Sequence, residues 1–233
     1  MNATIKRVYR VLHARFGPQG WWPIVDEDIA ACIYGVGAPR SDAERFEILV
    51  GCILAQNTQW YPNAVRALHA LKKGKKLVPA SLAQSRASTI AQLIRSAGYY
   101  NQKAERLRRI ARFWQDTPSL PDLPLENLRA ILLAQHGIGD ETADSIILYA
   151  AEKPSFVVDA YTRRIMGRMG LCEKDASYAD IQQMFHDALG SDDGVVPMFK
   201  EYHALLVELA KRHCKTKPVC GGCPLSGICA KKF

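Results

Sequence analysis

A short turn between two helical patterns most restricts what this chain can fold into. The turn is Gly137-Ile138-Gly139, and glycine can take the positive φ of a tight turn without steric cost. Apolar residues recur at helical spacing on both sides of it: Leu128, Ile131 and Leu132 before, and Ala143, Ile146, Ile147 and Ala150 after. Asp140 is expected to cap the second helix. The pattern predicts a helical hairpin whose turn brings backbone N–H groups close to a phosphate and binds a nucleic-acid backbone without reading bases.

A carboxylate follows the second helix of this hairpin. The apolar strip 156–158 ends at Asp159, immediately before the basic opening of another helix at residues 160–164. A negative charge so close to a phosphate-binding turn repels the ligand that the turn attracts. We therefore expect Asp159 to have a function of its own.

The pattern GIG…TA…VVDAYTRRI resembles the helix-hairpin-helix DNA glycosylases related to endonuclease III. In that superfamily the aspartate after the hairpin is catalytic, which implies this role for Asp159. Bifunctional members carry a lysine in the second helix of the hairpin, and the matching position here is Glu141. A carboxylate cannot form a Schiff base, so strand cleavage by lysine chemistry is not expected. Hairpins of this kind also occur as non-catalytic DNA clamps, and this alternative stays open.

A second segment, nearer the N-terminus, also resembles this superfamily. A strongly apolar helix is predicted to begin at Ser41 or Asp42 and to run into the polar residues Gln56 and Asn57. The stretch FEILVGCILAQNTQW resembles the same superfamily, in which the glutamine enters the gap left by a flipped nucleotide. The resemblance implies that Gln56 fills this gap and that Asn57 lies on the DNA beside it, although an ordinary solvated amide is the alternative. Rotating a base out of the stack costs a few kcal/mol, which such contacts must offset.

Four segments together resemble a narrower family, the bacterial 3-methyladenine DNA glycosylase III. They are WWP, FEILVGCILAQNTQW, SAGYYNQKAERL and QHGIGDETAD. The resemblance implies base-pocket walls at Trp22, Pro23 and Trp60, with Glu141 at the pocket. An aromatic slot suits a methylated purine, because alkylation at N3 leaves a positive charge that an aromatic face attracts. The alternative is that both Trp21 and Trp22 are core residues.

The turn in SAGYYNQKAERL corresponds to a DNA-touching turn in the superfamily, which implies DNA contacts from Gln102 and Lys103. It precedes a basic helix and follows the run Lys72-Lys73-Gly74-Lys75-Lys76, which we interpret as a solvated loop.

Four cysteines crowd the C-terminal segment, at Cys214, Cys220, Cys223 and Cys229. Such crowding indicates metal binding or disulfides, and a cytosolic setting disfavours disulfides. Four thiolates by themselves allow zinc or an iron–sulfur cluster. The run C-x5-C-x2-C-x5-C, with its KPxCxxCPL core, resembles the cluster loop of endonuclease III-like glycosylases, although the first gap is one residue shorter. The resemblance implies a [4Fe–4S] cluster with a structural role.

Composition limits the class of protein. A chain of 233 residues can bury a proper core, and helical spacing predominates over strand alternation, which predicts an all-α fold. No apolar run reaches the roughly twenty residues of a membrane span, and the start lacks the apolar core of a signal peptide. The net charge of +8 suits a polyanionic partner. We expect a cytoplasmic, nucleoid-associated monomer that binds double-stranded DNA containing a damaged base.

The predicted architecture has two helical lobes. A barrel domain at residues 42–151 carries the helix-hairpin-helix, and residues 1–41 join residues 152–233 in a second domain with the iron–sulfur loop. The predicted function is a monofunctional DNA glycosylase that excises alkylated, 3-methyladenine-like bases, with Asp159 stabilising the oxocarbenium-like sugar. The alternatives are a bifunctional glycosylase and AP lyase for oxidised pyrimidines, and a non-catalytic damage-binding protein.

Overall fold

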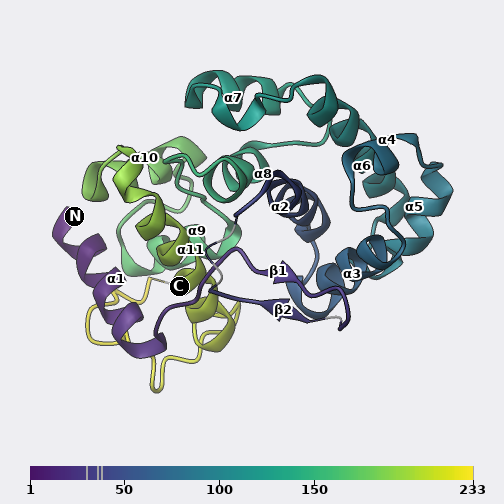
Figure 1. Ribbon diagram of the computed structural model, residues 1–233. Helices are drawn as coiled ribbons and strands as arrows, with labels where there is room; N and C mark the ends of the chain where they lie inside the picture. Colours follow the sequence, from purple (N-terminus) through teal and green to yellow (C-terminus); the bar gives the residue numbers. More distant parts are fainter. Residues whose placement is uncertain (30, 36, 38, 233) are drawn as a thin grey trace. The chain divides into compact units, whose positions relative to one another are not determined.

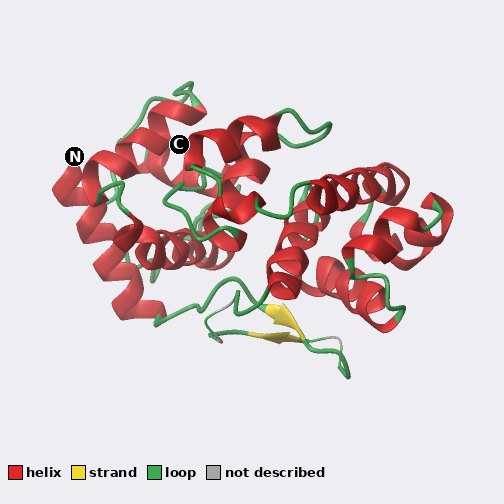
Figure 2. Cartoon of the chain, turned by 45° about the horizontal axis from the view of Figure 1, so that its top comes forward, coloured by secondary structure: helices red, strands yellow, loops and turns green. Residues whose placement is uncertain are grey.

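Apolar residues at helical spacing along most of the chain produce a helical protein, which confirms the all-α prediction. The computed structural model describes residues 1–29, 31–35, 37 and 39–232. Figure 1 shows the order of the elements, and Figure 2 shows that β1 and β2 form a small antiparallel ribbon among helices. The elements are α1 (Asn2–Phe16), β1 (Ile24–Val25), β2 (Cys32–Ile33), α2 (Asp42–Ala55), α3 (Val65–Lys73), α4 (Pro79–Gln84), α5 (Ala87–Leu93), α6 (Tyr100–Asp116), α7 (Leu125–Leu133), α8 (Asp140–Ser145), α9 (Ala160–Met169), α10 (Tyr178–Leu189) and α11 (Val196–Arg212).

Short irregular helical turns complete the chain. Two are π-helical, at Trp60–Ala64 and Ile146–Ala150, and the second continues α8. Three are 3₁₀ turns, at Arg95–Ala97, Leu120–Asp122 and Asp193–Val195. No helix in the described part of the chain is both long enough and apolar enough to cross a bilayer.

The chain divides into two compact units. The hairpin unit is Trp22–Glu152, and the split unit combines Met1–Trp21 with Lys153–Phe233. The hairpin unit thus starts about twenty residues before the boundary at 42 that we expected, because Trp22 and the β1–β2 ribbon belong to it.

The split unit has an aromatic core that fixes the strip leading to Asp159. Phe156 stacks on Phe185 with ring centroids 3.7 Å apart and meets the edges of Phe199 and Tyr202. The hydroxyl of Tyr202 donates to the carbonyl of Ile5, which ties α11 to α1. Because the strip 156–158 is fully buried, Asp159 is held at a defined point where α9 begins.

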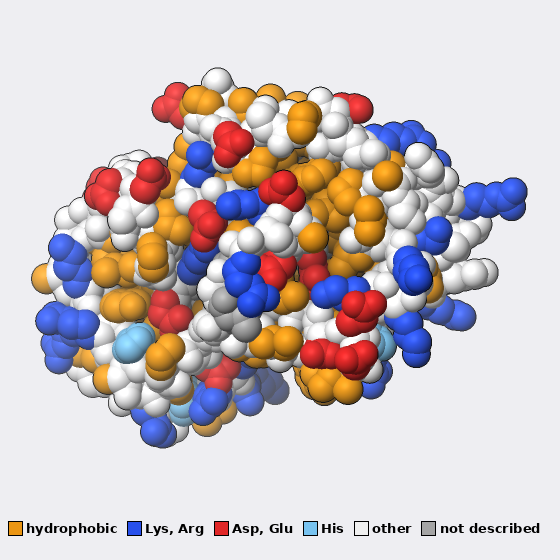
Figure 3. Space-filling view, in the orientation of Figure 1, with side chains coloured by type: hydrophobic (Ala, Val, Ile, Leu, Met, Phe, Trp, Pro, Cys, Tyr) orange, Lys and Arg blue, Asp and Glu red, His pale blue; other side chains and the backbone are white. Residues whose placement is uncertain are grey.

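Basic side chains are prominent on one part of the hairpin unit. In Figure 3 they gather over the region that Figure 1 labels α3 to α6. The exposed members on these helices and the loops between them include Arg66, Lys73, Lys75, Arg86, Arg95, Arg109 and Arg112. This surface carries much of the net positive charge that favours a polyanionic partner.

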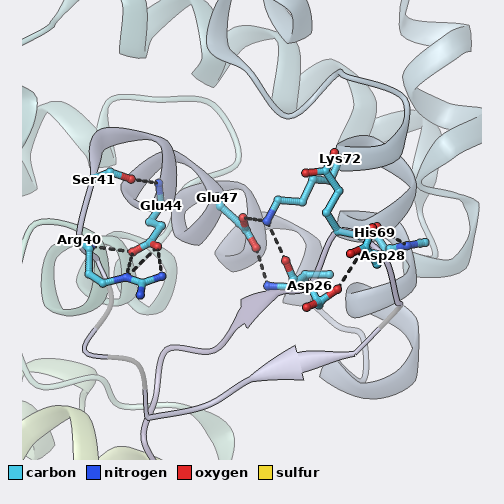
Figure 4. Close-up of polar contacts among 10 residues, drawn as sticks. Asp26, Asp28, Arg40, Ser41, Glu44, Glu47, His69 and Lys72 are labelled. Carbon is cyan, nitrogen blue, oxygen red and sulfur yellow. Dashed lines mark hydrogen bonds and ion pairs between the residues drawn. The ribbon is translucent and has the colours of Figure 1, made fainter.

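The ribbon is fastened to α2 and α3 by one buried carboxylate (Figure 4). Glu47 accepts hydrogen bonds from the N–H of Val25 at 2.7 Å and from Nζ of Lys72 at 2.8 Å. Lys72 also donates to the carbonyl of Val25 at 2.7 Å. Burial, the largest effect, raises the pKa of Glu47, although Lys72 and the Val25 amide act in the opposite direction. This closed set of polar contacts explains why the ribbon belongs to the hairpin unit, and it shows that Lys72 is more than part of a solvated loop.

Candidate functional site

The hairpin between α7 and α8 has the predicted shape, with one correction at its turn. Gly137 has φ 87°, the left-handed region that favours glycine, whereas Gly139 is extended at φ −105° and ψ −179°. The N-cap of α8 is Gly139, so Asp140 is the first helical residue and not the cap that we expected. Ile138 buries its side chain and donates its N–H to the carbonyl of Gln135 at 3.1 Å. Ile138 therefore anchors the turn.

An arginine joins the two helices of the hairpin. Arg129 on α7 donates from Nε to Asp144 at 2.9 Å and from Nη2 to Asp140 at 2.6 Å. These two carboxylates hold the pKa of Arg129 above its ordinary value, with the hydrogen bond to buried Asp144 as the largest cause. The pairing sets the angle between α7 and α8 and thereby fixes the turn between them.

The end of α2 lies against the hairpin. Nε2 of Gln56 donates to the carbonyl of Gly137 and to Oγ1 of Thr142, both at 3.0 Å, and its Oε1 accepts from Nη1 of Arg106 at 2.8 Å. Asn57 follows with an exposed side chain and a left-handed backbone at φ 52°. The structure thus brings Gln56 to the hairpin turn, but the amide of Gln56 is engaged within the protein.

Trp22 and Trp60 come together in the hairpin unit. Their ring centroids are 4.9 Å apart at an interplanar angle of 80°, and Trp22 meets Tyr149 in a similar edge-to-face contact at 5.0 Å. Only 6% of Trp22 and 8% of Trp60 is exposed, and Pro23 is buried beside them. Gly51 of α2 forms the floor of the cluster, where a Cβ would lie 3.2 Å from Trp22 and 3.3 Å from Trp60. The sequence signal correctly grouped these residues, but their rings are perpendicular and do not form a parallel slot.

Glu141 is exposed in the first turn of α8. Its carboxylate lies near the thiol of Cys52, whose pKa is raised chiefly by burial and further by the negative charge of Glu141. Because Cys52 follows Gly51 on α2, Glu141 and the tryptophan cluster border the same stretch of that helix.

The two residues at the start of α6 that were expected to contact DNA have different environments. Gln102 is exposed, as a DNA contact requires. Lys103 is only 1% exposed, and its Nζ donates to the carbonyls of Leu54 and Ala97 and to Oγ1 of Thr58 at 2.8–3.0 Å. The ammonium of Lys103 is buried and engaged by three acceptors, so in this structure it is not available for the DNA contact expected from the resemblance.

Asp159 is the N-cap of α9. Its Oδ1 accepts the N–H of Thr162 at 2.7 Å, and its Oδ2 lies 3.7 Å from Nε2 of His203 on α11. Burial acts to raise the pKa of Asp159, but the interactions with His203 and Thr162 outweigh it and leave the pKa below its ordinary value. The carboxylate is thus ionised near neutral pH while only 13% of its side chain is exposed. His203 is buried on α11, and its signal in the sequence is a polar residue on the buried face of an otherwise apolar helix.

The four C-terminal cysteines share one neighbourhood. Burial raises the pKa of Cys223, and Cys214, Cys220 and Cys229 act on it in the same direction, which places each of these three near Cys223. Two arginines of α9 fasten this loop: Arg164 donates to the carbonyl of Cys214, and Arg168 donates to its sulfur at 3.4 Å. Within the described ranges, no three His, Cys, Asp or Glu side chains are grouped tightly enough to hold a metal ion.

Comparison with known proteins shows which family the chain resembles. Residues 50–190 match the model of the HhH-GPD superfamily base excision DNA repair proteins. A Methanocaldococcus jannaschii protein that carries the name of a DNA repair glycosylase is 37% identical over 98% of this chain and 96% of its own length. Endonuclease III of Sulfolobus acidocaldarius is 29% identical over 79% of this chain and 81% of its own length.

Solved structures agree on the fold. The Helicobacter pylori 3-methyladenine DNA glycosylase bound to 1,N6-ethenoadenine superposes with a TM-score of 0.70 and 24% identity, covering 91% of this chain and 97% of that one. A non-covalent endonuclease III–DNA complex gives 0.71 and 19%, covering 99% and 96%. The family match covers more than half of the chain and includes both the hairpin and Asp159. The chain therefore belongs to the HhH-GPD superfamily of base excision DNA repair proteins and is a DNA N-glycosylase.

Proposed function

We propose that this protein is a monofunctional DNA glycosylase that flips out and excises alkylated, 3-methyladenine-like bases from double-stranded DNA. The observation that carries the proposal is Asp159, a shielded carboxylate that is kept ionised where α9 begins. Such a group suits the stabilisation of positive charge on a sugar. The presence of Glu141 where bifunctional relatives carry lysine supports hydrolysis without strand cleavage.

Asp159 acts on the sugar in the proposed mechanism. As the N-glycosidic bond breaks, the carboxylate stabilises the oxocarbenium-like transition state more than the ground state, and it orients the attacking water. The bond's electron pair leaves with the base. A base that already carries positive charge departs as a neutral molecule, so no protonating acid is needed.

The base pocket of the proposal consists of Trp22, Pro23, Trp60 and Glu141. Aromatic faces attract a cationic base, and the carboxylate of Glu141 adds a complementary charge near the same stretch of α2. The edge-to-face packing of Trp22 and Trp60 means that a stacked base requires one of these rings to turn. A pocket of this kind discriminates by shape as well as charge.

DNA binding in the proposal uses the hairpin turn and the loops beside it. The backbone at Gly137, Ile138 and Gly139 grips a phosphate, Gln56 fills the gap left by the flipped nucleotide, and Asn57 and Gln102 contact the duplex. The exposed side chains of Asn57 and Gln102 support their part. We also propose that the protein works as a monomer on nucleoid DNA in the cytoplasm, since its substrate is chromosomal.

Cys214, Cys220, Cys223 and Cys229 would hold a [4Fe–4S] cluster. Their shared neighbourhood supports this cofactor, and thiolate–iron bonds would fix a tail that buries little apolar surface of its own. The proposed role of the cluster is structural, and no step of base release passes through it.

The test is a panel of single-lesion duplexes assayed for free base and for strand cleavage. We expect release of 3-methyladenine without nicking and without borohydride-trapped adduct. Release of oxidised pyrimidines with a trapped adduct would establish the bifunctional alternative. Tight binding to abasic DNA with no base released from any duplex would instead indicate a damage-binding protein. Either of these two results overturns the proposal.

A further inference from the structure

Both ends of the Gln56 amide are used inside the hairpin unit. Its Nε2 bridges the carbonyl of Gly137, in the turn, and Oγ1 of Thr142, in the first turn of α8. Its Oε1 faces Nη1 of Arg106 on α6 at 2.8 Å. One side chain therefore connects the end of α2 with both sides of the hairpin turn and with a third helix.

Arg106 decides which way this amide points. A guanidinium only donates hydrogen bonds, so the oxygen of Gln56 must face it and the NH₂ group must face the two hairpin acceptors. An apolar residue at position 106 would leave the oxygen of Gln56 without this donor. Arg106 thus acts on the hairpin through Gln56.

Arg106 also packs directly on the turn. A Cβ added at Gly137 would lie 2.4 Å from Nε and 2.8 Å from Cδ of Arg106, so only glycine leaves room for this side chain. The Nε atom is buried there without a hydrogen-bond partner among the described residues. A desolvated guanidinium nitrogen is costly, which indicates that contact with the turn and with Gln56 holds the arginine in place.

We propose that Arg106 is a positioning residue that orients Gln56 as a brace and holds the hairpin turn in its DNA-binding shape before DNA arrives. The proposal rests on the hairpin being the DNA-backbone grip described above. It gives Gln56 a role in the free protein that precedes any entry into the duplex, because entry breaks the three hydrogen bonds of the brace. Breaking these hydrogen bonds therefore couples binding of the DNA backbone by the hairpin to insertion of Gln56 into the duplex.

The first experiment measures amide hydrogen exchange in residues 135–142 of the full chain without DNA. Arg106→Met and Gln56→Leu should each speed this exchange by about tenfold, the effect of losing roughly one net hydrogen bond from a local opening equilibrium. The double variant should exchange no faster than the faster single variant, because both changes remove one brace. Arg109→Met, which removes an exposed charge from the same helix, is the matched control and should leave the exchange unchanged.

The second readout separates bracing from gap filling. Arg106→Met should raise the Kd for undamaged duplex and the KM for damaged duplex by similar factors and leave kcat unchanged. Gln56→Leu should raise the Kd for undamaged duplex by a similar factor. Arg106→Lys, which keeps one donor, should recover part of the loss. If Gln56 acts only as a gap filler, Gln56→Leu changes kcat on damaged duplex and leaves undamaged binding intact, which contradicts the proposal.

Additive exchange rates in the double variant, or an equal effect of Arg109→Met, also overturn the proposal. Should Arg106→Met fail to fold, Gln56→Glu keeps the acceptor for Arg106 and removes both donors to the hairpin, so faster exchange is still expected and unchanged exchange refutes the brace. Because the exchange experiment uses no DNA and no lesion, its outcome is independent of whether 3-methyladenine is the substrate.

Discussion

Nε2 of His203 lies 3.7 Å from Oδ2 of Asp159. This distance is within ion-pair range but longer than a hydrogen bond, and the interaction with His203 lowers the pKa of Asp159. The other carboxylate oxygen is fixed by the Thr162 amide at 2.7 Å. α9 and α11 of the split unit therefore each contact a different carboxylate oxygen of Asp159, and each contact can be tested separately.

Replacement of Asp159 by asparagine tests the proposed chemistry. Asparagine caps a helix as well as aspartate does and still accepts from Thr162, so α9 should remain intact. The lost charge should lower base release by at least 10²- to 10³-fold, on the order of the 3–4 kcal/mol of one preorganised group. Duplex binding should be retained or improve, since a charge that repels phosphate is gone. Release of free 3-methyladenine at nearly the wild-type rate by a folded Asp159→Asn protein would refute the mechanism.

His203→Gln should change the pH dependence of the enzyme. His203 helps to lower the pKa of Asp159, so removing it should raise that pKa and shift the acid limb of kcat/KM to higher pH. The sign for stability is the same: the contribution of a carboxylate with a depressed pKa is present above its unfolded pKa and disappears as pH falls through its folded pKa. His203→Gln should therefore narrow the pH range in which the ionised Asp159 carboxylate stabilises the fold. His186→Gln, on α10 of the same unit, is the control, and an unmoved acid limb in His203→Gln would exclude the coupling.

The two glycines of the hairpin should respond differently to valine. Gly137→Val meets both a left-handed backbone and the Arg106 side chain, so it should lower thermal stability and weaken binding to all duplexes alike. At Gly139 the backbone is extended and a Cβ meets nothing within 4 Å, so Gly139→Val should leave stability nearly unchanged and weaken only DNA binding. Binding is measured on damaged and undamaged duplexes of equal length. A loss confined to one lesion would place these glycines in the base pocket.

The C-terminal cysteines predict a coloured protein. Anaerobically purified protein should be brown, with broad visible absorption, and should contain iron and sulfide. Cys223→Ser should lose the colour and lower the melting temperature, whereas Cys172→Ser, outside the tail but in the same unit, should keep both. Chelation of the metal should mimic Cys223→Ser. Colourless, zinc-loaded protein from the same purification would show that the four thiolates bind a single ion.

Lys103→Met tests whether the buried ammonium of Lys103 stabilises the fold. Methionine fills a similar volume but leaves the carbonyls of Leu54 and Ala97 without this donor, so the free energy of unfolding should fall by about 2–4 kcal/mol. The matched Lys73→Met variant removes an exposed charge and should change stability by less than about 0.5 kcal/mol. Denaturant unfolding measures both. A stable Lys103→Met protein with weakened DNA binding would instead support the DNA contact that the resemblance implied.

Local chemistry explains what was predictable. Helix spacing, the glycine turn and the cap at Ser41 depend on neighbouring residues, so the hairpin, the apolar helix before Gln56 and the all-α class follow from the sequence alone. The same holds for the position of Asp159 at the start of a helix and for the grouping of the four cysteines. The roles proposed for these residues come from the family resemblance. That resemblance rests on motif spacing, which is also a property of the linear chain.

Tertiary structure decided the contacts between residues far apart in the chain. Gln102 and Lys103 are neighbours in the same basic segment. About 100° of helix rotation nevertheless places Gln102 in solvent and directs Lys103 to three acceptors inside the protein. Gln56 meets Arg106 across 50 positions and Gly137 across 81, and His203 meets Asp159 from another helix. Helical periodicity states which residues share a face but not which partner that face meets, because the packing of helices depends on the whole core. The orientation of the Gln56 amide, the perpendicular rings of Trp22 and Trp60 and the charge beside Asp159 are therefore properties of the folded chain alone.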